Sequence, residues 1–182
     1  PVTTPTTYRE RIAIPPVGVN MYVDGIVLDS RNRLWAIVKN SRVASWDVIL
    51  NHWDGQTWNT CHLETYLPDG LGAVDSVLTV DSQDRIHVLL TAVELNDVNK
   101  ENSWGHPSCE VFHLMSSDGG DSFACDQVSE PDPAKANWLP SISKPGPFHP
   151  VEQPLILYTH GEPGEGCSPE TKTEVWCRFI ES

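Results

Sequence analysis

Short apolar runs separated by polar turn sequences recur along the chain, and this pattern predicts β-strands. The two clearest runs, residues 26–38 and 78–90, can be laid over each other. Each reads as a strand, a tight Asp-Ser-x-x-Arg turn and a second strand, with the turns at Asp29 to Arg33 and Asp81 to Arg85. A repeat of this kind predicts a chain built from similar β units.

Each unit is predicted to continue with a third and a fourth strand. These are residues 46–53 and 58–63 in the first unit, and residues 109–115 and 123–128 in the second. A third, incomplete unit follows, with strands at residues 138–143, 155–159 and 173–180. Residues 8–14 alternate around charged side chains and are predicted to form an edge strand that ends before Pro15 and Pro16. The pattern as a whole predicts an all-β fold.

The turn before the fourth strand of the second unit has a specific sequence: residues 116–123 read Ser-Ser-Asp-Gly-Gly-Asp-Ser-Phe. Its glycines supply the positive φ angles of a tight hairpin. The pattern Ser-x-Asp-x-Gly-x-Ser-aromatic resembles the Asp-box, the bacterial neuraminidase repeat. Its key residues here are Ser116, Asp118, Gly120 and Phe123. Those of a looser copy in the first unit are Asp54, Gly55 and Trp58. We expect Asp118 to accept backbone N–H groups and Phe123 to pack into the core.

In the families that carry it, the Asp-box joins the third and fourth strands of a β-propeller blade. The resemblance, to the sialidase-like superfamily, implies a β-propeller of four-stranded antiparallel blades, with about three blades in this chain. They would span about residues 22–63, 75–128 and 137–182 of one half-ring domain, residues 1–182. Because the third blade lacks a strand, we expect a head-to-tail homodimer in which each strand 8–14 completes the partner's third blade. The alternative is that the chain is a piece of a longer propeller.

Composition narrows the choice of partner and compartment. The net charge is −13, which argues against nucleic acid or an anionic membrane as partner. No apolar run approaches the roughly 20 residues of a membrane span. Five cysteines without a C-x-x-C pair, seven tryptophans and few lysines predict a secreted or periplasmic protein with one or two disulfides. The chain begins with Pro1 and not with Met, which we interpret as a processed or trimmed polypeptide.

The predicted connections are short on one face and long on the other. The short ones are the Asp-Ser turns and the box turns, so Asp54 and Asp118 are expected to be turn residues. The long ones are residues 15–24, 39–45, 64–75, 92–108, 129–137 and 159–172. Long loops on a rigid scaffold carry function, which places the site on their face. There Asp24 and Asp75, near the starts of first strands and aligned by an assumed bulge, are candidate catalytic carboxylates. The alternative is that each caps a loop.

Candidate ligand-binding residues come from the same long connections. They are Arg42, Glu94, Trp104, His106 and His160. The C–H face of a sugar packs on an aromatic ring and its hydroxyl groups need acceptors, so this mixture suits carbohydrate. The alternatives are a solvated loop anchored by Trp104 and a His160 without a role in binding. No D-x-D-x-D-G calcium loop occurs, and no metal or other cofactor is predicted.

Three functions remain open. The favoured one is a propeller that binds carbohydrate without chemistry; the others are a carbohydrate-active enzyme (glycosidase or polysaccharide lyase) and a protein-interaction propeller. The arginine triad of sialidases is not carried over, because Arg31, Arg33 and Arg85 fall in or beside the short turns on the opposite face. Within the predicted strands, His87 and His113 are expected to be structural.

Overall fold

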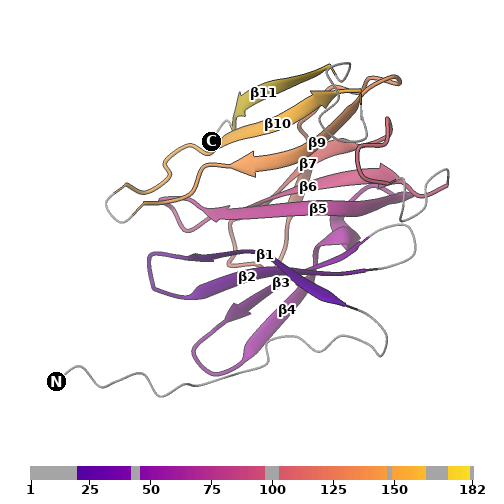
Figure 1. The fold of residues 1–182 in the computed structure, drawn as a ribbon. Helices are drawn as coiled ribbons and strands as arrows, with labels where there is room; N and C mark the ends of the chain where they lie inside the picture. The colour runs from indigo at the N-terminus through magenta and orange to yellow at the C-terminus, as the bar shows by residue number, and fades with distance from the viewer. Residues whose placement is uncertain (1–19, 42–45, 97–102, 147–148, 163–171, 181–182) are drawn as a thin grey trace.

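The structure is a computed structural model of the 182-residue chain, and it describes residues 20–41, 46–96, 103–146, 149–162 and 172–180. Its elements are β1 (Met21–Leu28), β2 (Leu34–Ser41), β3 (Trp46–Trp53), β4 (Trp58–His62), the 3-10 helix η1 (Leu63–Tyr66), β5 (Leu71–Val80), β6 (Ile86–Glu94), β7 (Glu110–Ser116), β8 (Ala124–Gln127), β9 (Ala136–Ile142), β10 (Leu155–Gly161) and β11 (Thr173–Phe179). Apart from η1, every regular element of the described residues is a strand (Figure 1), so the all-β prediction is confirmed. The strand expected at residues 8–14 lies outside the described residues.

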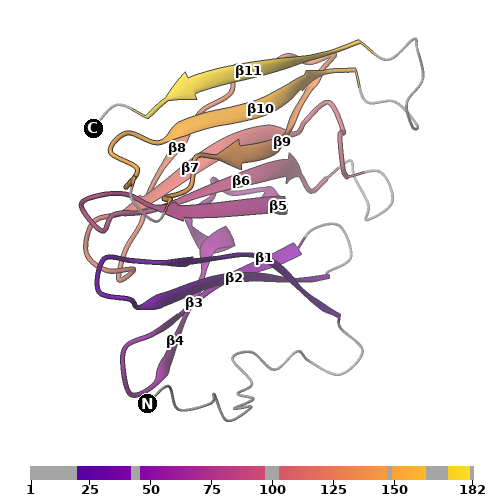
Figure 2. The same ribbon diagram turned by 60° about the vertical axis from the view of Figure 1, so that its left-hand side comes forward.

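The strands form three consecutive antiparallel groups. Each strand from β1 to β4 pairs with the next, as do the strands from β5 to β8 and from β9 to β11. A single pair, Trp46 with Ala73, joins the first two groups into one eight-stranded sheet, and the third is a separate three-stranded sheet. The groups follow one another through the molecule, with β11 and β4 at opposite ends (Figure 2). No sheet closes on itself within the described residues.

The first strands of the three groups lie side by side, β1 next to β5 and β5 next to β9. All three have an irregular register with the strand that follows. The shifts lie between Val23 and Gly25 in β1, between Ala73 and Asp75 in β5, and in β9 opposite the step from Leu157 to Thr159. A bulge bends a strand and turns its side chains toward a new direction, which affects the residues at this end of the sheets.

Three apolar clusters of the described residues hold the groups together, and β6 contributes to each of them. The largest lies between the first two groups, where Trp35, Leu50 and Leu90 are among its members. Two smaller ones lie between the second and third groups; one includes Leu89 and Ile156, and the other includes Val93 and Trp138. Neighbouring residues of β6 thus belong to opposite clusters, as the period of two in a strand requires. Every residue of β6 before Glu94 is buried, so this strand is the centre of the core.

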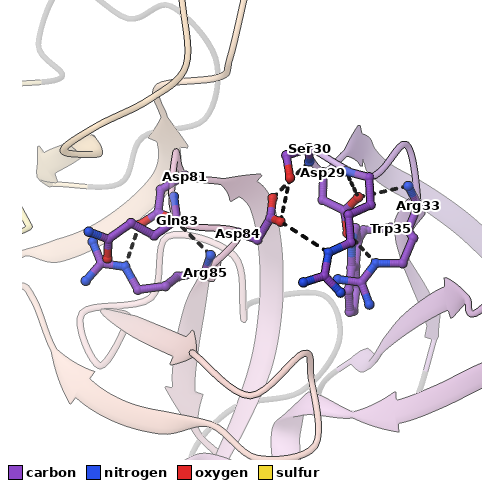
Figure 3. A network of polar contacts seen from close by, with 9 residues as sticks. Asp29, Ser30, Arg33, Trp35, Asp81, Gln83, Asp84 and Arg85 are labelled. Carbon is purple, nitrogen blue, oxygen red and sulfur yellow. Dashed lines mark hydrogen bonds and ion pairs between the residues drawn. The ribbon is translucent and has the colours of Figure 1, made fainter.

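The two Asp-Ser-x-x-Arg turns have the same internal structure (Figure 3). Asp29 Oδ1 accepts the backbone N–H groups of Arg31 and Arg33 at 2.9 Å, and Oδ2 accepts Arg33 Nε at 2.6 Å. Asp81 makes the matching bonds to the backbone of Gln83 and Arg85 at 2.9 Å and to Arg85 Nε at 2.5 Å. A buried carboxylate that accepts several N–H groups is strongly held in its charged form, and the pKa of each aspartate is accordingly lowered by these bonds despite burial.

The two turns also contact each other, which ties the first group to the second. Asp84, in the second turn, accepts the backbone N–H of Ser30 at 2.9 Å and the hydroxyl of the same residue at 2.6 Å (Figure 3). Asp84 has a φ of 59°, in the left-handed region that aspartate and asparagine tolerate better than most residues. The equivalent residue of the first turn, Asn32, has the same φ.

The two box turns join third to fourth strands in both groups. Asp118 accepts the backbone N–H of Ser122 at 3.1 Å and the hydroxyls of Ser116 and Ser122. Phe123 is buried in the large cluster against Tyr66. In the shorter first box, Asp54 accepts the backbone N–H groups of Gln56 and Thr57.

Four cysteines are described, namely Cys61, Cys109, Cys125 and Cys177, and all have free thiols. The disulfides expected from the sequence therefore do not form among these four, which lie in or beside four different strands. The fifth, Cys167, lies outside the described residues. No helix among the described residues is long and apolar enough to cross a membrane.

Candidate functional site

Lys39 brings the two candidate carboxylates together. Its Nζ lies 3.2 Å from Asp24 Oδ1 and 3.2 Å from Asp75 Oδ1. Asp24 Oδ2 also accepts the hydroxyl of Ser76, and Asp75 Oδ1 accepts the backbone N–H of the same serine at 3.0 Å. The four residues come from β1, β2 and β5, so the cluster exists only where the first two groups meet.

The bulges explain how Asp24 and Asp75 reach the same lysine from unlike positions. Asp75 pairs with Thr91, and the matching pair in the first group is Tyr22 with Lys39. Asp24 is the extra residue of its own bulge. A bulge was expected to align the two aspartates, and the structure has one in each strand, at different places in β1 and β5. Their carboxylates nevertheless converge because β1 lies against β5.

The cluster is mostly withdrawn from solvent. The side chains of Asp24, Lys39 and Asp75 are 9%, 16% and 23% exposed. Burial raises the pKa of Asp24, and the Ser76 hydrogen bond and the Lys39 charge only partly oppose this shift. Buried ion pairs are stabilising only when their hydrogen bonds are satisfied, and here each carboxylate is bound to the lysine and to Ser76. Because the ammonium group occupies the space between the acids, the arrangement suits polar recognition better than acid–base catalysis.

Two aromatic rings stand beside the cluster. Lys39 Nζ lies 5.3 Å from the centre of the Trp46 ring, and the Tyr22 ring meets Trp46 edge to face at 5.4 Å. Tyr22 is 47% exposed and Trp46 is half-buried. Sequence reasoning missed Tyr22, Lys39 and Trp46. It ended the second strand at residue 38 and assigned Lys39 to a loop, whereas β2 continues to Ser41.

A cavity of about 470 Å³ opens in the second group, near the sequence-predicted ligand residues. Glu94 and His106 line it, together with Glu110, Asp132 and the ring of Phe112. Glu110 and Asp132 were not predicted as ligands. Three carboxylates and an imidazole around an apolar floor are groups that bind hydroxyl-rich molecules.

A hydrogen-bond chain runs from this cavity to His160. Glu110 Oε2 accepts the hydroxyl of Ser129 and the Asn137 amide at 3.0 Å. His160 Nδ1 donates to Asn137 Oδ1 at 2.9 Å, since an amide oxygen only accepts. Burial raises the pKa of Glu110, while the bonds from Ser129 and Asn137 lower it. His160 is only 8% exposed and packs against Trp176, so it supports Glu110 from behind and does not line the cavity.

An aromatic row connects the Lys39 cluster to this region. Trp46 packs against the apolar cluster that contains Val74 and Trp138. Trp104, 57% exposed, meets Trp138 edge to face at 6.5 Å. Of the residues predicted from sequence, Asp24 and Asp75 therefore lie together, and Glu94 and His106 line one cavity. Trp104 lies beside Trp138. Arg42 lies outside the described residues.

The remaining predicted residues lie at the other end of the strands. Hydrogen bonds lower the pKa of Asp118 to about 2 and also lower that of Asp54, as expected for carboxylates that accept N–H groups in turns. Within the strands, His87 bridges Asp81 Oδ2 at 3.1 Å and His113 at 3.0 Å. Burial lowers the pKa of His113 to about 4, so the pair is neutral near pH 7.

Comparison with known proteins adds little to this geometry. No protein-family model matches the sequence, and no curated protein matches it significantly. Among solved structures, the chain is similar to a protein of unknown function from Dyadobacter fermentans DSM 18053, with 12% sequence identity and a TM-score of 0.49. The match covers 83% of this chain and 40% of that one, so this chain spans less than half of the length of that protein.

Proposed function

We propose that the chain is a secreted or periplasmic carbohydrate-binding protein of Asp-box β-propeller architecture. The glycan binds at the end of the strands where Asp24, Lys39 and Asp75 meet. The observation that carries the proposal is the contact of one lysine with two carboxylates beside the exposed Tyr22 ring and the half-buried Trp46 ring.

Three features support the propeller arrangement. The chain has consecutive antiparallel groups of four, four and three strands. Their first strands lie side by side, as the inner strands of adjacent blades do. Both Asp-box turns join a third strand to a fourth. Propellers have at least four blades, so three groups need further strands from elsewhere.

The chemistry of the site suits a sugar. The rings of Tyr22 and Trp46 offer apolar surface for a sugar's C–H face, and their flat shape costs little conformational entropy on binding. Ionised groups make stronger hydrogen bonds to hydroxyls than neutral groups do. Asp24 and Asp75 supply hydrogen-bond acceptors and Lys39 supplies a donor at one place. A sugar hydroxyl can therefore donate one hydrogen bond and accept another there.

Binding is favoured over hydrolysis because the lysine holds both acids. A glycosidase needs one protonated acid and one free carboxylate on either side of the bond that breaks. Here Asp24 and Asp75 share the same ammonium group, whose nitrogen lies 3.2 Å from an oxygen of each acid, so neither carboxylate is free for such a role.

The test is a glycan array followed by calorimetry and a turnover assay on the bound glycans. Trp46→Phe, which keeps most of the core packing, should weaken binding about tenfold, and Lys39→Met about 10- to 100-fold. The matched control is Trp53→Phe at the other end of β3, which should bind normally. Turnover that Asp75→Asn abolishes while binding persists would support the enzyme instead. Neither binding nor turnover would support the protein-interaction alternative.

We propose further that a second copy of the chain completes the third group. In this sheet β10 is the middle strand, and β9 and β11 each pair only with β10 in the described residues; β9 lies against β5, β6 and β7. All seven residues of β11 are exposed, including Val175 at 74% and Phe179 at 58%. An exposed edge that carries apolar side chains favours strand addition, and residues 8–14 of a partner are the proposed strand.

A further inference from the structure

We propose that Asp47, His62 and Glu64 form a binding site for a divalent transition-metal ion of the Zn²⁺ class. The site lies in the first strand group and is separate from the proposed carbohydrate site, so either proposal can fail without the other.

Local topology brings the three side chains together. His62 is the last residue of β4 and pairs with Ile49 of β3. Asp47 lies two residues before Ile49 and therefore on the same face of the sheet. Glu64 lies in η1, which follows β4 directly. The hairpin and the 3-10 turn thus present two carboxylates and one imidazole to a single point.

The distances suit one shared ion. His62 Nδ1 lies 3.0 Å from Asp47 Oδ1 and 3.6 Å from Glu64 Oε1, and the ligand atoms of all three residues lie within 4.8 Å of one another. Zinc bonds to nitrogen and oxygen are about 2.0–2.2 Å long, so neighbouring ligands of a tetrahedral ion are roughly 3.3–3.6 Å apart. The observed separations require only small side-chain movements to hold such an ion.

The surroundings orient the ligands and leave an approach from solvent. Asn40 Nδ2 donates to Asp47 Oδ2 at 2.9 Å, which fixes the carboxylate with Oδ1 toward His62. Supports of this kind are typical of the residues behind metal ligands. The Asp47 and Glu64 side chains are 8% and 17% exposed, whereas that of His62 is 50% exposed. An ion can therefore enter on the histidine side, where water supplies the fourth ligand.

The ligand set indicates the class of metal. Calcium and magnesium take oxygen ligands, so the imidazole nitrogen disfavours them. One imidazole and two carboxylates, without thiolate, suit Zn²⁺ and neighbouring divalent ions.

Calorimetric titration of the chelator-treated full chain with Zn²⁺ tests the proposal. We expect one ion per chain, an affinity loss of about 100-fold for His62→Ala and for Glu64→Gln, and a loss of about tenfold for Asn40→Ala. Zinc should also raise the melting temperature of the wild type and not that of His62→Ala, because an ion that binds only the folded state stabilises it.

The controls separate this site from other histidines and thiols. His149→Ala and Cys177→Ser change exposed residues outside the group and should bind Zn²⁺ as the wild type does. Circular dichroism without metal shows whether Glu64→Gln, which keeps the shape of the side chain, is folded. The absence of stoichiometric binding to the wild type would overturn the proposal, as would a folded Glu64→Gln variant that binds as tightly as the wild type.

Discussion

At the scale of single residues, Asp29 and Asp81 organise their turns by accepting several N–H groups each. The repeated Asp-Ser-x-x-Arg sequence predicted two similar tight turns. It did not indicate that each aspartate would bind the arginine four residues later, at 2.6 Å for Arg33 and 2.5 Å for Arg85. The side chains of Asp29 and Asp81 are 1% and 0% exposed, whereas those of Arg33 and Arg85 are 28% and 18% exposed, so the carboxylate of each ion pair is buried and the arginine partly buried. Arg33 and Arg85, which were not assigned to a sialidase-like arginine triad, therefore have a structural role in these turns.

Replacement of Asp81 by asparagine should therefore be strongly destabilising. An amide group keeps the shape of the side chain but turns N–H donors toward Arg85 or the turn backbone, and it leaves the partly buried Arg85 guanidinium without its counter-charge. We expect a loss of about 3–5 kcal/mol in the free energy of unfolding, measured by urea denaturation. Asp84→Asn in the same turn is the matched control. It should cost less than about 1 kcal/mol, because its partner Ser30 is exposed and asparagine tolerates a positive φ. Equal losses for the two variants would contradict the role given to Asp81.

The candidate site shows where sequence reasoning stops at this scale. Asp24 and Asp75 could be selected because each lies near the start of a predicted strand. Lys39, which joins them, lies 36 residues before Asp75 in sequence. Only the packing of β1 against β5 brings it there, and a single sequence without coordinates contains no signal for that contact. For the same reason Glu110 could not be connected to His160 through Asn137.

At the scale of elements, strands and turns were predictable because their signals are local. Short apolar runs on either side of an Asp-Ser turn identified β5 and β6, and glycine-containing turns identified both box hairpins. Strand ends were less accurate: β2 and β6 extend into stretches expected to be loops, because backbone pairing continues past the predicted ends at residues 38 and 90. A bulge was expected only for the alignment of Asp24 with Asp75, and the irregularity of β9 was not predicted, since a bulge changes the register by one residue and leaves the pattern ambiguous.

The box turn at residues 116–123 also packs against the first strand group, through Gly120 and Trp35. Substitutions at Gly120 and at its neighbour Gly119 test this contact. Both have positive φ, 91° and 81°. A Cβ atom at Gly120 would lie 3.1 Å from Trp35 Cζ3, whereas at Gly119 it would meet nothing within 4 Å. Trp35 cannot easily move, because it stacks on His52 and donates to Asp29.

Gly119→Ala should cost about 1–2 kcal/mol for backbone strain alone. Gly120→Ala should cost about 1–3 kcal/mol more, because the methyl group also displaces Trp35. The two variants differ by one position, so the difference between their unfolding free energies isolates the packing of β8's turn on β2. Indistinguishable values would show that the contact between Gly120 and Trp35 contributes nothing to stability.

At the scale of the whole molecule, the first and the third strand groups, which lie at opposite ends, differ. The third group has three strands where the first two have four, and β11 is exposed along its full length. β1 carries exposed apolar residues as well, with Val23 at 68% and Ile26 at 61%. The composition shows that the chain is acidic, but it does not indicate which apolar side chains are exposed in the fold. If the blades of two chains form one ring, β11 of each chain lies near residues 8–14 and β1 of the other, and both exposed surfaces are buried by the same contact.

Multi-angle light scattering over a range of concentrations measures this directly, and the expected mass is twice that of one chain. Val175→Lys places a charge on the exposed face of β11, where lysine discourages strand addition, and should shift the protein toward monomer. Asn59→Lys on the exposed outer strand β4 is the control and should leave the dimer intact, because that strand faces away from the ring axis in a propeller. Deletion of residues 1–14 should also give monomer, since it removes the segment that we propose pairs with the partner's β11. A compact monomer at every concentration of the wild type would end the dimer proposal and leave the alternative in which further blades come from a longer chain. The carbohydrate site would remain testable in either case, because Asp24, Lys39 and Asp75 all belong to one chain.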